Sequence, residues 1–135
     1  MARVRNDQSV CSCAVVSQRI DSPFGCWTQT EYRPAHLASV VERISHFHGP
    51  VAHAHERIFP NGVVELIVHL DHRYSLVTND RREPFADVCI GGLYTSAFVI
   101  EAPDRACRVL SIRLRPASAF AVLGMPMSEL TNITA

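Results

Sequence analysis

The clearest strand signal in the chain is carried by Phe59-Pro60-Asn61-Gly62-Val63-Val64-Glu65-Leu66-Ile67-Val68-His69-Leu70. Within it, apolar residues alternate with a mixed set: Val64, Leu66, Val68 and Leu70 against Val63, Glu65, Ile67 and His69. Because successive side chains of a strand point to opposite faces, one face is wholly apolar and the other is mixed. The pattern predicts a strand over residues 63–70 with its apolar face in a core.

A turn signal stands immediately before this strand. Proline presets one backbone dihedral, and the Asn61-Gly62 pair that follows Pro60 tolerates positive φ. Residues 51–59, on the other side of the turn, form another β-like run. The sequence therefore predicts a hairpin that joins residues 51–59 to residues 63–70.

The rest of the chain alternates short β-like runs with turn residues. Further strands are predicted over residues 40–47, 73–78, 86–90, 97–101 and 107–114, with a short turn or helix at 34–41 and a polar loop at 79–84. This spacing favours a sandwich or barrel over a βαβ pattern. Residues 116–123 begin with proline and precede Gly124, which predicts a helix, and a second short helical piece follows at 127–130.

The ends of the packed region are predicted from composition. Residues 1–26 show no clear period, and we expect an irregular lead-in before a single domain over residues 27–135. No apolar run has the length of a membrane span, and the N-terminus lacks the apolar block of a signal peptide. The cysteine count is odd and no C-x-x-C pair occurs, which favours reduced thiols and a cytoplasmic protein.

Charge and motifs narrow the class of function. The chain has 13 basic and 13 acidic residues, which argues against a dedicated nucleic-acid surface. There is no G-x-S-x-G, no P-loop and no G-x-G-x-x-G. We therefore expect no enzymatic activity and no cofactor.

Histidines are the main candidates for site chemistry. His46-x-His48 and His53-x-His55 place two pairs on strand faces, and His69 is positioned to join them. Imidazole suits zinc, nickel or iron, so a metal centre is one alternative. The metal-cupin motif also requires a glutamate several residues after His-x-His and a later histidine, and both are missing here. We expect the histidines to be polar lining rather than metal ligands.

Glu65 is the other candidate, because it lies within the strongest strand. A carboxylate there would either contact a ligand or pair with Arg57 or Arg113. The ligand-binding residues predicted for this chain are His46, His48, His53, His55, Glu65 and His69.

An ordered set of segments resembles a known family. Tyr32-Arg33-Pro34, the stretch from His46 to Pro50, the turn and strand at 57–70, Gly91-Gly92-Leu93, and Leu123-Gly124-Met125-Pro126 occur in the right order over about residues 27–133. Together they resemble the N-terminal, effector-sensing domain of AraC-type transcriptional regulators. The resemblance implies a mostly-β, cupin-like double-stranded β-helix, or jelly-roll barrel, with short C-terminal helices.

The resemblance also implies a function and partners. Such domains sense a small-molecule effector and often form homodimers, and the helix at 116–123 is our candidate for the dimer or interdomain surface. The helix-turn-helix half that normally follows is not in this sequence, so we expect no direct DNA contact by this chain, which would be a domain fragment or a naturally shortened protein. Two alternatives stay open: a small metal-dependent cupin enzyme that uses the histidines, and a truncated dimerisation partner of full-length regulators.

Overall fold

The computed structural model describes residues 13–23, 25–51 and 54–134. Most of these residues lie in strands: β1 (Cys13–Ser22), β2 (Gly25–Pro34), β3 (Val41–Gly49), β4 (His55–Ile58), β5 (Val64–His69), β6 (Ser75–Thr78), β7 (Arg81–Pro84), β8 (Val88–Gly91), β9 (Phe98–Glu101) and β10 (Cys107–Leu114). The helical elements are short: the 3-10 helices η1 (Ala35–Leu37) and η2 (Met127–Leu130), and the α-helix α1 (Pro116–Leu123).

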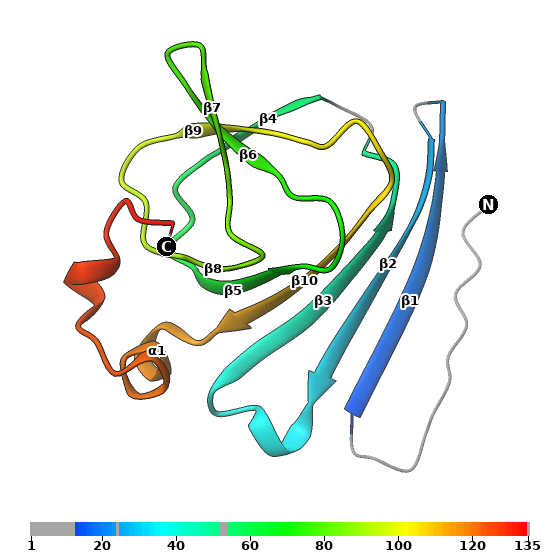
Figure 1. Cartoon of the computed structure of the whole chain (residues 1–135). Helices are drawn as coiled ribbons and strands as arrows, with labels where there is room; N and C mark the ends of the chain where they lie inside the picture. Colours follow the sequence, from blue (N-terminus) through cyan, green and yellow to red (C-terminus); the bar gives the residue numbers. More distant parts are fainter. Residues whose placement is uncertain (1–12, 24, 52–53, 135) are drawn as a thin grey trace.

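The described strands form two antiparallel sheets. The larger has six strands in the order β1-β2-β3-β10-β5-β8, and the smaller has four in the order β4-β9-β6-β7. The smaller sheet lies across from the β10-β5-β8 part of the larger one, while β1 and β2 extend beyond it (Figure 1). The predicted mostly-β fold with C-terminal helices is confirmed, and the two facing sheets are consistent with a cupin-like sandwich.

The predicted hairpin around Pro60-Asn61-Gly62 is wrong. β4 pairs with β9, whereas β5 pairs with β10 and β8, so the turn carries the chain from the smaller sheet to the larger one. The local turn chemistry is nevertheless present: the Val63 N–H donates to Oδ1 of Asn61 at 3.1 Å, and Gly62 has φ of 64°. Turn residues determine the local backbone conformation, but they do not determine whether the two strands on either side of the turn pair with each other.

Two predicted irregular segments are strands instead. Cys13–Ser22 lies within the predicted irregular lead-in, but it forms the edge strand β1, paired in register with β2. Arg81–Pro84 lies within the predicted polar loop, but it pairs with β6 across Asn79 and Asp80, which adopt φ of 44° and 66°. Positive φ at both central residues is the geometry of a two-residue hairpin turn. Every residue of β7 is exposed, so the strand lacks the alternation of apolar and polar residues that would have indicated it in the sequence.

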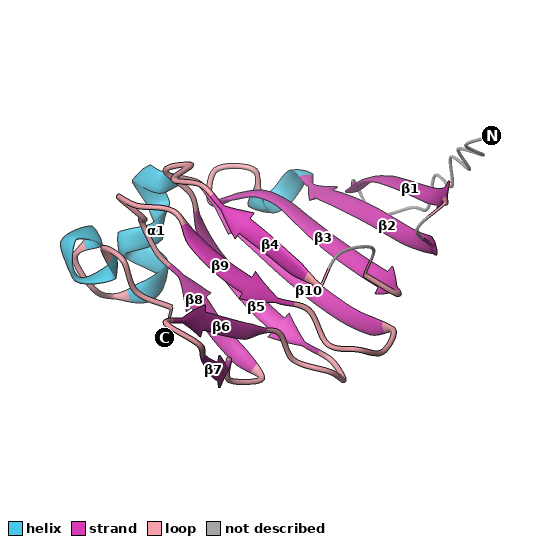
Figure 2. Ribbon diagram, turned by 90° about the horizontal axis from the view of Figure 1, so that it is seen from above, coloured by secondary structure: helices cyan, strands magenta, loops and turns pink. Residues whose placement is uncertain are grey.

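The predicted helix at residues 116–123 is confirmed. Pro116 occupies its first turn, and Gly124 ends it with φ of 69°, a left-handed conformation in which its N–H donates to the Phe120 carbonyl at 2.8 Å. α1 lies at the end of the larger sheet (Figure 2). Phe120 and Val122 are exposed on it, and its role in a dimer stays a prediction. In the part of the chain that the structure describes, no helix is long and apolar enough to cross a membrane.

The best-packed core lies where α1 meets the larger sheet. Its buried members come from β3, β5, β10, α1 and η2: Val41, Val64, Leu114, Ala119 and Leu130. Leu66 and Val68 share the face of Val64 on β5 but are only half-buried, and Leu70 is exposed. The predicted apolar face of β5 is therefore fully buried only at Val64, and its mixed face points to the space between the sheets.

Asp71, which follows β5, fastens that end of the strand to β10. Its carboxylate accepts the backbone N–H groups of Arg108 and His72 at 2.8 and 2.7 Å and the Arg108 Nε–H at 3.0 Å. The hydrogen bond from the Arg108 backbone, followed by the one from His72, lowers the pKa of Asp71 to about 2. The charged carboxylate thus stabilises the fold above its ordinary pKa of 3.8, and this contribution is lost as the pH falls toward 2.

We expect Asp71→Asn to lower the melting temperature at pH 7, because the neutral amide is a weaker acceptor for these donors. The difference between the variant and the original protein should shrink as the pH falls below about 4 and be much smaller at pH 2, where the Asp71 carboxyl of the folded protein is about half protonated. Thermal denaturation followed by circular dichroism at pH 7, 4 and 2 measures this. A difference that stays constant over this range would contradict the assignment.

Candidate functional site

A cavity of about 300 Å³ lies between the two sheets. Its wall is mostly apolar and aromatic, with a few polar groups, and is formed by Phe47, Glu56, Ile58, Asn61, Val63, Glu65, Ile67, His69, Tyr74, Phe85, Gly91, Gly92, Tyr94, Phe98, Ile100, Val109, Ser111 and Thr134. Such a composition, a concave apolar surface with few converging polar groups, is typical of small-molecule sites.

Strand register explains which side chains reach this cavity. On the larger sheet Ile67 stands opposite Ser111, and His69 stands opposite Val109, so the mixed face of β5 and one face of β10 line it together. On the smaller sheet Glu56 pairs with Ile100 in the same way. Cross-strand partners share a face of the sheet. The strand residues that line the cavity are therefore every second residue of each strand.

His69 is the most enclosed polar side chain of the cavity. Its residue is 6% exposed, and the ring lies parallel to Phe85 and close to Tyr74, with centroids 6.2 and 6.1 Å away. Nδ1 lies 3.1 Å from the carbonyl oxygen of Ala86, which can only accept, so Nδ1 carries a hydrogen and donates. In the neutral tautomer that agrees with this bond, the accepting lone pair lies on Nε2, which has no hydrogen-bond partner among the described residues.

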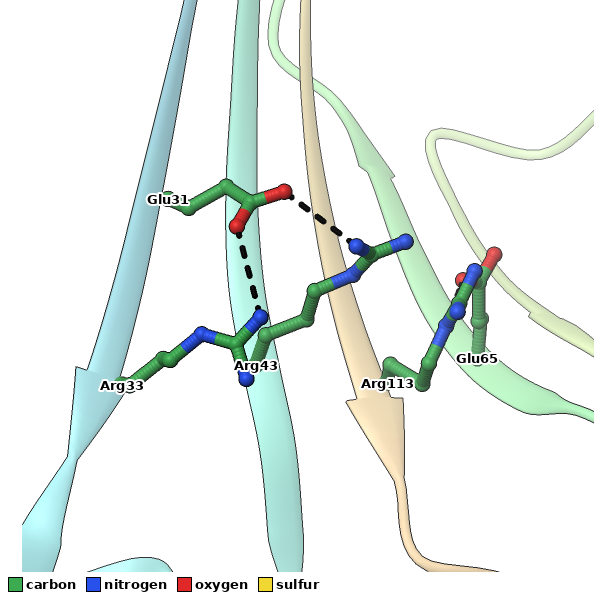
Figure 3. A network of polar contacts seen from close by, with 5 residues as sticks. All are labelled: Glu31, Arg33, Arg43, Glu65 and Arg113. Atoms are coloured by element: carbon green, nitrogen blue, oxygen red, sulfur yellow. Dashed lines mark hydrogen bonds and ion pairs between the residues drawn. The ribbon is translucent and has the colours of Figure 1, made fainter. Parts of the chain in front are cut away.

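Glu65 joins the cavity to a row of charges on the same face of the larger sheet. The Arg113 Nε–H donates to Glu65 Oε1 at 2.9 Å, so of the two predicted partners Arg113 is the one that pairs. Farther along, Glu31 accepts from Arg43 at 3.2 Å and lies 3.6 Å from Arg33 (Figure 3). Arg43 and Arg113 stand opposite each other in the ladder, and each is balanced by a glutamate on a neighbouring strand.

His46, His48 and His55, three of the other predicted site residues, do not line this cavity. His46 and His48 lie on the opposite face of β3, in register with Leu110 and Arg108, and their ring centroids are 6.4 Å apart. His55 is exposed and lies 3.5 Å from Glu101. His53 lies outside the described residues. Of the six residues predicted, the structure places Glu65 and His69 together in the wall.

Sequence reasoning missed several polar groups of the wall. Glu56 lines the cavity and is also exposed, so it lies at the cavity mouth. The sequence signal that could have identified it is its position next to His55, because neighbouring residues of a strand face opposite sides. Tyr74 lies deeper, and burial, with smaller contributions from Cys107 and from the charge of Glu56, raises its pKa far above the usual range. Its hydroxyl therefore stays protonated. Ser111 lies in the middle of an apolar strand, and nothing in the local pattern singled it out.

The C-terminal segment closes one side of the cavity. Gly92 and Leu93 donate their N–H groups to the carbonyls of Ile133 and Leu130, both at 2.9 Å, and the Asn132 N–H returns a bond to Leu93 at 2.7 Å. The Tyr94 hydroxyl is hydrogen-bonded to the Thr134 hydroxyl, and both residues line the cavity. A second space of about 610 Å³ shares Phe85, Tyr94, Phe98 and Thr134 with this cavity. The segment thus forms part of the wall between two spaces.

The thiols near the cavity are poorly suited to nucleophilic chemistry. Cys89 and Cys107 are buried, and burial raises the pKa of both, so they remain protonated. Within residues 13–23, 25–51 and 54–134, no group of three His, Cys, Asp or Glu side chains is arranged to hold a metal ion. The described wall offers aromatic surface and a few hydrogen-bonding groups.

A family model described as a domain of unknown function (DUF6597) matches residues 30–135, a region that runs from β2 to the end of the chain and includes every described residue of the cavity wall. No curated protein matches the chain at a significant level.

Proposed function

This chain belongs to the DUF6597 family, and on that premise we propose that it is a non-catalytic domain that binds a small molecule in the cavity between its sheets. The observation that carries the proposal is the cavity itself. Its volume of about 300 Å³ falls at the lower end of the range for ligand pockets, roughly 300–1,000 Å³. A compact ligand is therefore the expected occupant.

Binding without catalysis agrees best with the chemistry of the wall. The Glu65 carboxylate is held by Arg113, and the Tyr74 hydroxyl remains protonated at neutral pH. Nδ1 of His69 is hydrogen-bonded to the Ala86 carbonyl, and this bond fixes the orientation of the ring. Nε2, the second ring nitrogen, is left to interact with a ligand. Fixed polar groups in an apolar wall give orientation and specificity to a bound molecule.

The hydrogen bonds of the C-terminal segment suggest how occupancy would be transmitted. Gly92, Tyr94 and Thr134 all contact the cavity, and each belongs to the junction between the end of β8 and residues 130–134. A ligand that packs better when this junction is closed would shift the population toward the closed form. The proposed role is therefore that of a sensor. Ligand binding would be reported by how firmly the C-terminal segment is held against the end of β8.

We propose further that this sensing serves transcriptional regulation of the AraC type. Support comes from the ordered segments that resemble the effector domains of those regulators and from a mostly-β sandwich of the expected kind. In such regulators the DNA-binding domain follows the sensor, which is consistent with an output at the C-terminal end. DNA binding itself is no part of the proposal for this chain.

The binding function is tested by blocking the cavity. A library of small neutral, cationic and anionic molecules is screened by thermal denaturation, and we expect hits that stabilise the fold by about 1.4 kcal/mol at ten times their Kd. For a domain of this size this corresponds to roughly 3–6 °C in melting temperature. Ser111→Trp, which inserts an indole into the cavity, should raise the Kd of these hits at least about tenfold.

The matched control is Leu110→Trp, one position earlier on β10 and on the opposite face of the sheet. It should leave the Kd of the hits within about twofold while introducing the same side chain. In the titration of the original protein, hydrogen exchange at the amides of Gly92 and Asn132 should slow as the ligand binds. The proposal fails if no library member binds, or if Leu110→Trp and Ser111→Trp weaken binding equally.

A further inference from the structure

The charged and titratable groups that line the cavity are acidic or neutral. Among the described residues of the wall, the carboxylates are Glu56 and Glu65, the imidazole is that of His69, and no arginine is present. Every basic residue of the chain other than histidine is an arginine. The described wall therefore offers no guanidinium to an anionic ligand, and its one imidazole already donates from Nδ1 to the Ala86 carbonyl.

The two carboxylates differ in how their charge is balanced. Glu65 is paired with Arg113, whose guanidinium lies outside the cavity wall. Glu56 forms no ion pair within the described part of the chain. Its charge nevertheless reaches into the cavity, since it contributes to the high pKa of Tyr74. One uncompensated negative charge thus stands at the mouth of an apolar cavity.

The hydrogen-bonding groups of the cavity also favour a donor on the ligand. Nε2 of His69 accepts, the carboxylate of Glu56 accepts, and Oε2 of Glu65 has no partner among the described residues. The wall also carries the hydroxyls of Tyr74, Tyr94, Ser111 and Thr134, which can accept a hydrogen bond as well as donate one, and those of Tyr94 and Thr134 are already hydrogen-bonded to each other. A molecule that carries N–H groups satisfies these acceptors, whereas a carboxylate adds a further acceptor.

Aromatic rings complete the pattern. Phe47, Tyr74, Phe85, Tyr94 and Phe98 all line the cavity. The faces of aromatic rings carry negative electrostatic potential and attract ammonium groups, and they also pack well against an apolar ligand body. The Tyr94 and Phe98 rings are already close to each other, with centroids 4.2 Å apart, and form a continuous aromatic wall.

From these features we infer that the cavity selects an organic cation: a primary ammonium group on a small apolar body, with the ammonium directed to Glu56 and the body among the aromatic rings. This inference rests on the proposed ligand-binding function and names the chemical class of the ligand. Charge complementarity at the mouth would also attract such a molecule from solution.

The test uses three probes that share a phenylethyl body and differ in the charge of the group attached to it: 2-phenylethylammonium, 2-phenylethanol and 3-phenylpropanoate. Isothermal titration at neutral pH with the full chain measures the Kd of each. We expect the ammonium to bind about tenfold more tightly than the alcohol and the carboxylate to bind most weakly. Raising the salt concentration should reduce the preference for the ammonium.

Glu56→Gln tests the residue that carries the inference. Because Glu56 is exposed and has no ion-pair partner in the described chain, the variant should fold normally. It should raise the Kd of 2-phenylethylammonium about tenfold and leave that of 2-phenylethanol within about twofold. Glu129→Gln, an exposed glutamate in η2 away from the cavity, is the matched control and should change neither value.

The results separate this inference from the function it rests on. If 3-phenylpropanoate binds as tightly as the ammonium, or if Glu56→Gln leaves the ammonium affinity unchanged, the choice of a cation is overturned. In that case binding of 2-phenylethanol that Ser111→Trp abolishes would still uphold the cavity as a ligand site. If no probe and no library member binds there, the proposed function itself is overturned.

Discussion

Replacing Gly92 by alanine is expected to release the C-terminal segment from the sheet and to lower the free energy of unfolding by about 3 kcal/mol or more. A Cβ atom at this position would lie 1.8 Å from the carbonyl oxygen of Leu130, 2.8 Å from its carbonyl carbon and 3.1 Å from the Ile133 oxygen. All three are backbone atoms, so no side-chain rotation relieves the overlap. The segment has to move, and it takes its hydrogen bonds to Gly92 and Leu93 with it.

The loss should extend beyond the contact itself. Leu130 is 2% exposed and belongs to the core with Val64 and Leu114, so displacing its carbonyl also withdraws a core side chain. Urea denaturation measures the stability, and hydrogen exchange at Gly92, Leu93 and Asn132 reports the release. Gly91→Ala is the matched control, because a Cβ atom there meets only the Ile67 side chain at 3.7 Å and the Glu65 oxygen at 3.9 Å. Equal stability of the two variants would contradict the packing described for the C-terminal segment.

The sequence predicted correctly those strands and helices that are determined by residues close together in the chain. The strand predicted at 107–114 and the helix predicted at 116–123 match β10 and α1, because apolar runs, an initial proline and a terminal glycine act within a few residues. Strand β1 was missed because Ser17, Gln18 and Arg19 interrupt its apolar pattern, and its order comes from pairing with β2. Such pairing is a property of two segments together.

The candidate site depended more heavily on distant pairing. Glu65 and His69 were found because they stand in the strongest strand, but Glu56 reaches the cavity only through the pairing of β4 with β9, more than 40 residues away in sequence. The residue pattern of β3 likewise did not indicate which of its two faces turns toward the cavity. Phe47 points into the cavity, and the histidines on either side of it point to the other face. A shift of one residue would have exchanged them, and only the register against β10 settles the choice.

Leu114→Ala is expected to lower the free energy of unfolding by about 3 kcal/mol while leaving ligand affinity unchanged. Leu114 is 2% exposed at the end of β10, opposite the fully buried Val64, and shares the core with Ala119 of α1. It does not line the cavity, so at a temperature where the variant is folded the Kd of a library hit should stay within about twofold. Leu110→Ala on the same strand, where the side chain is only half-buried, should cost roughly 1 kcal/mol. If the two leucines cost the same in urea denaturation, the core is not concentrated under α1. If Leu114→Ala weakens binding as strongly as it weakens the fold, the cavity depends on the helical end of the molecule as well as on its two sheets.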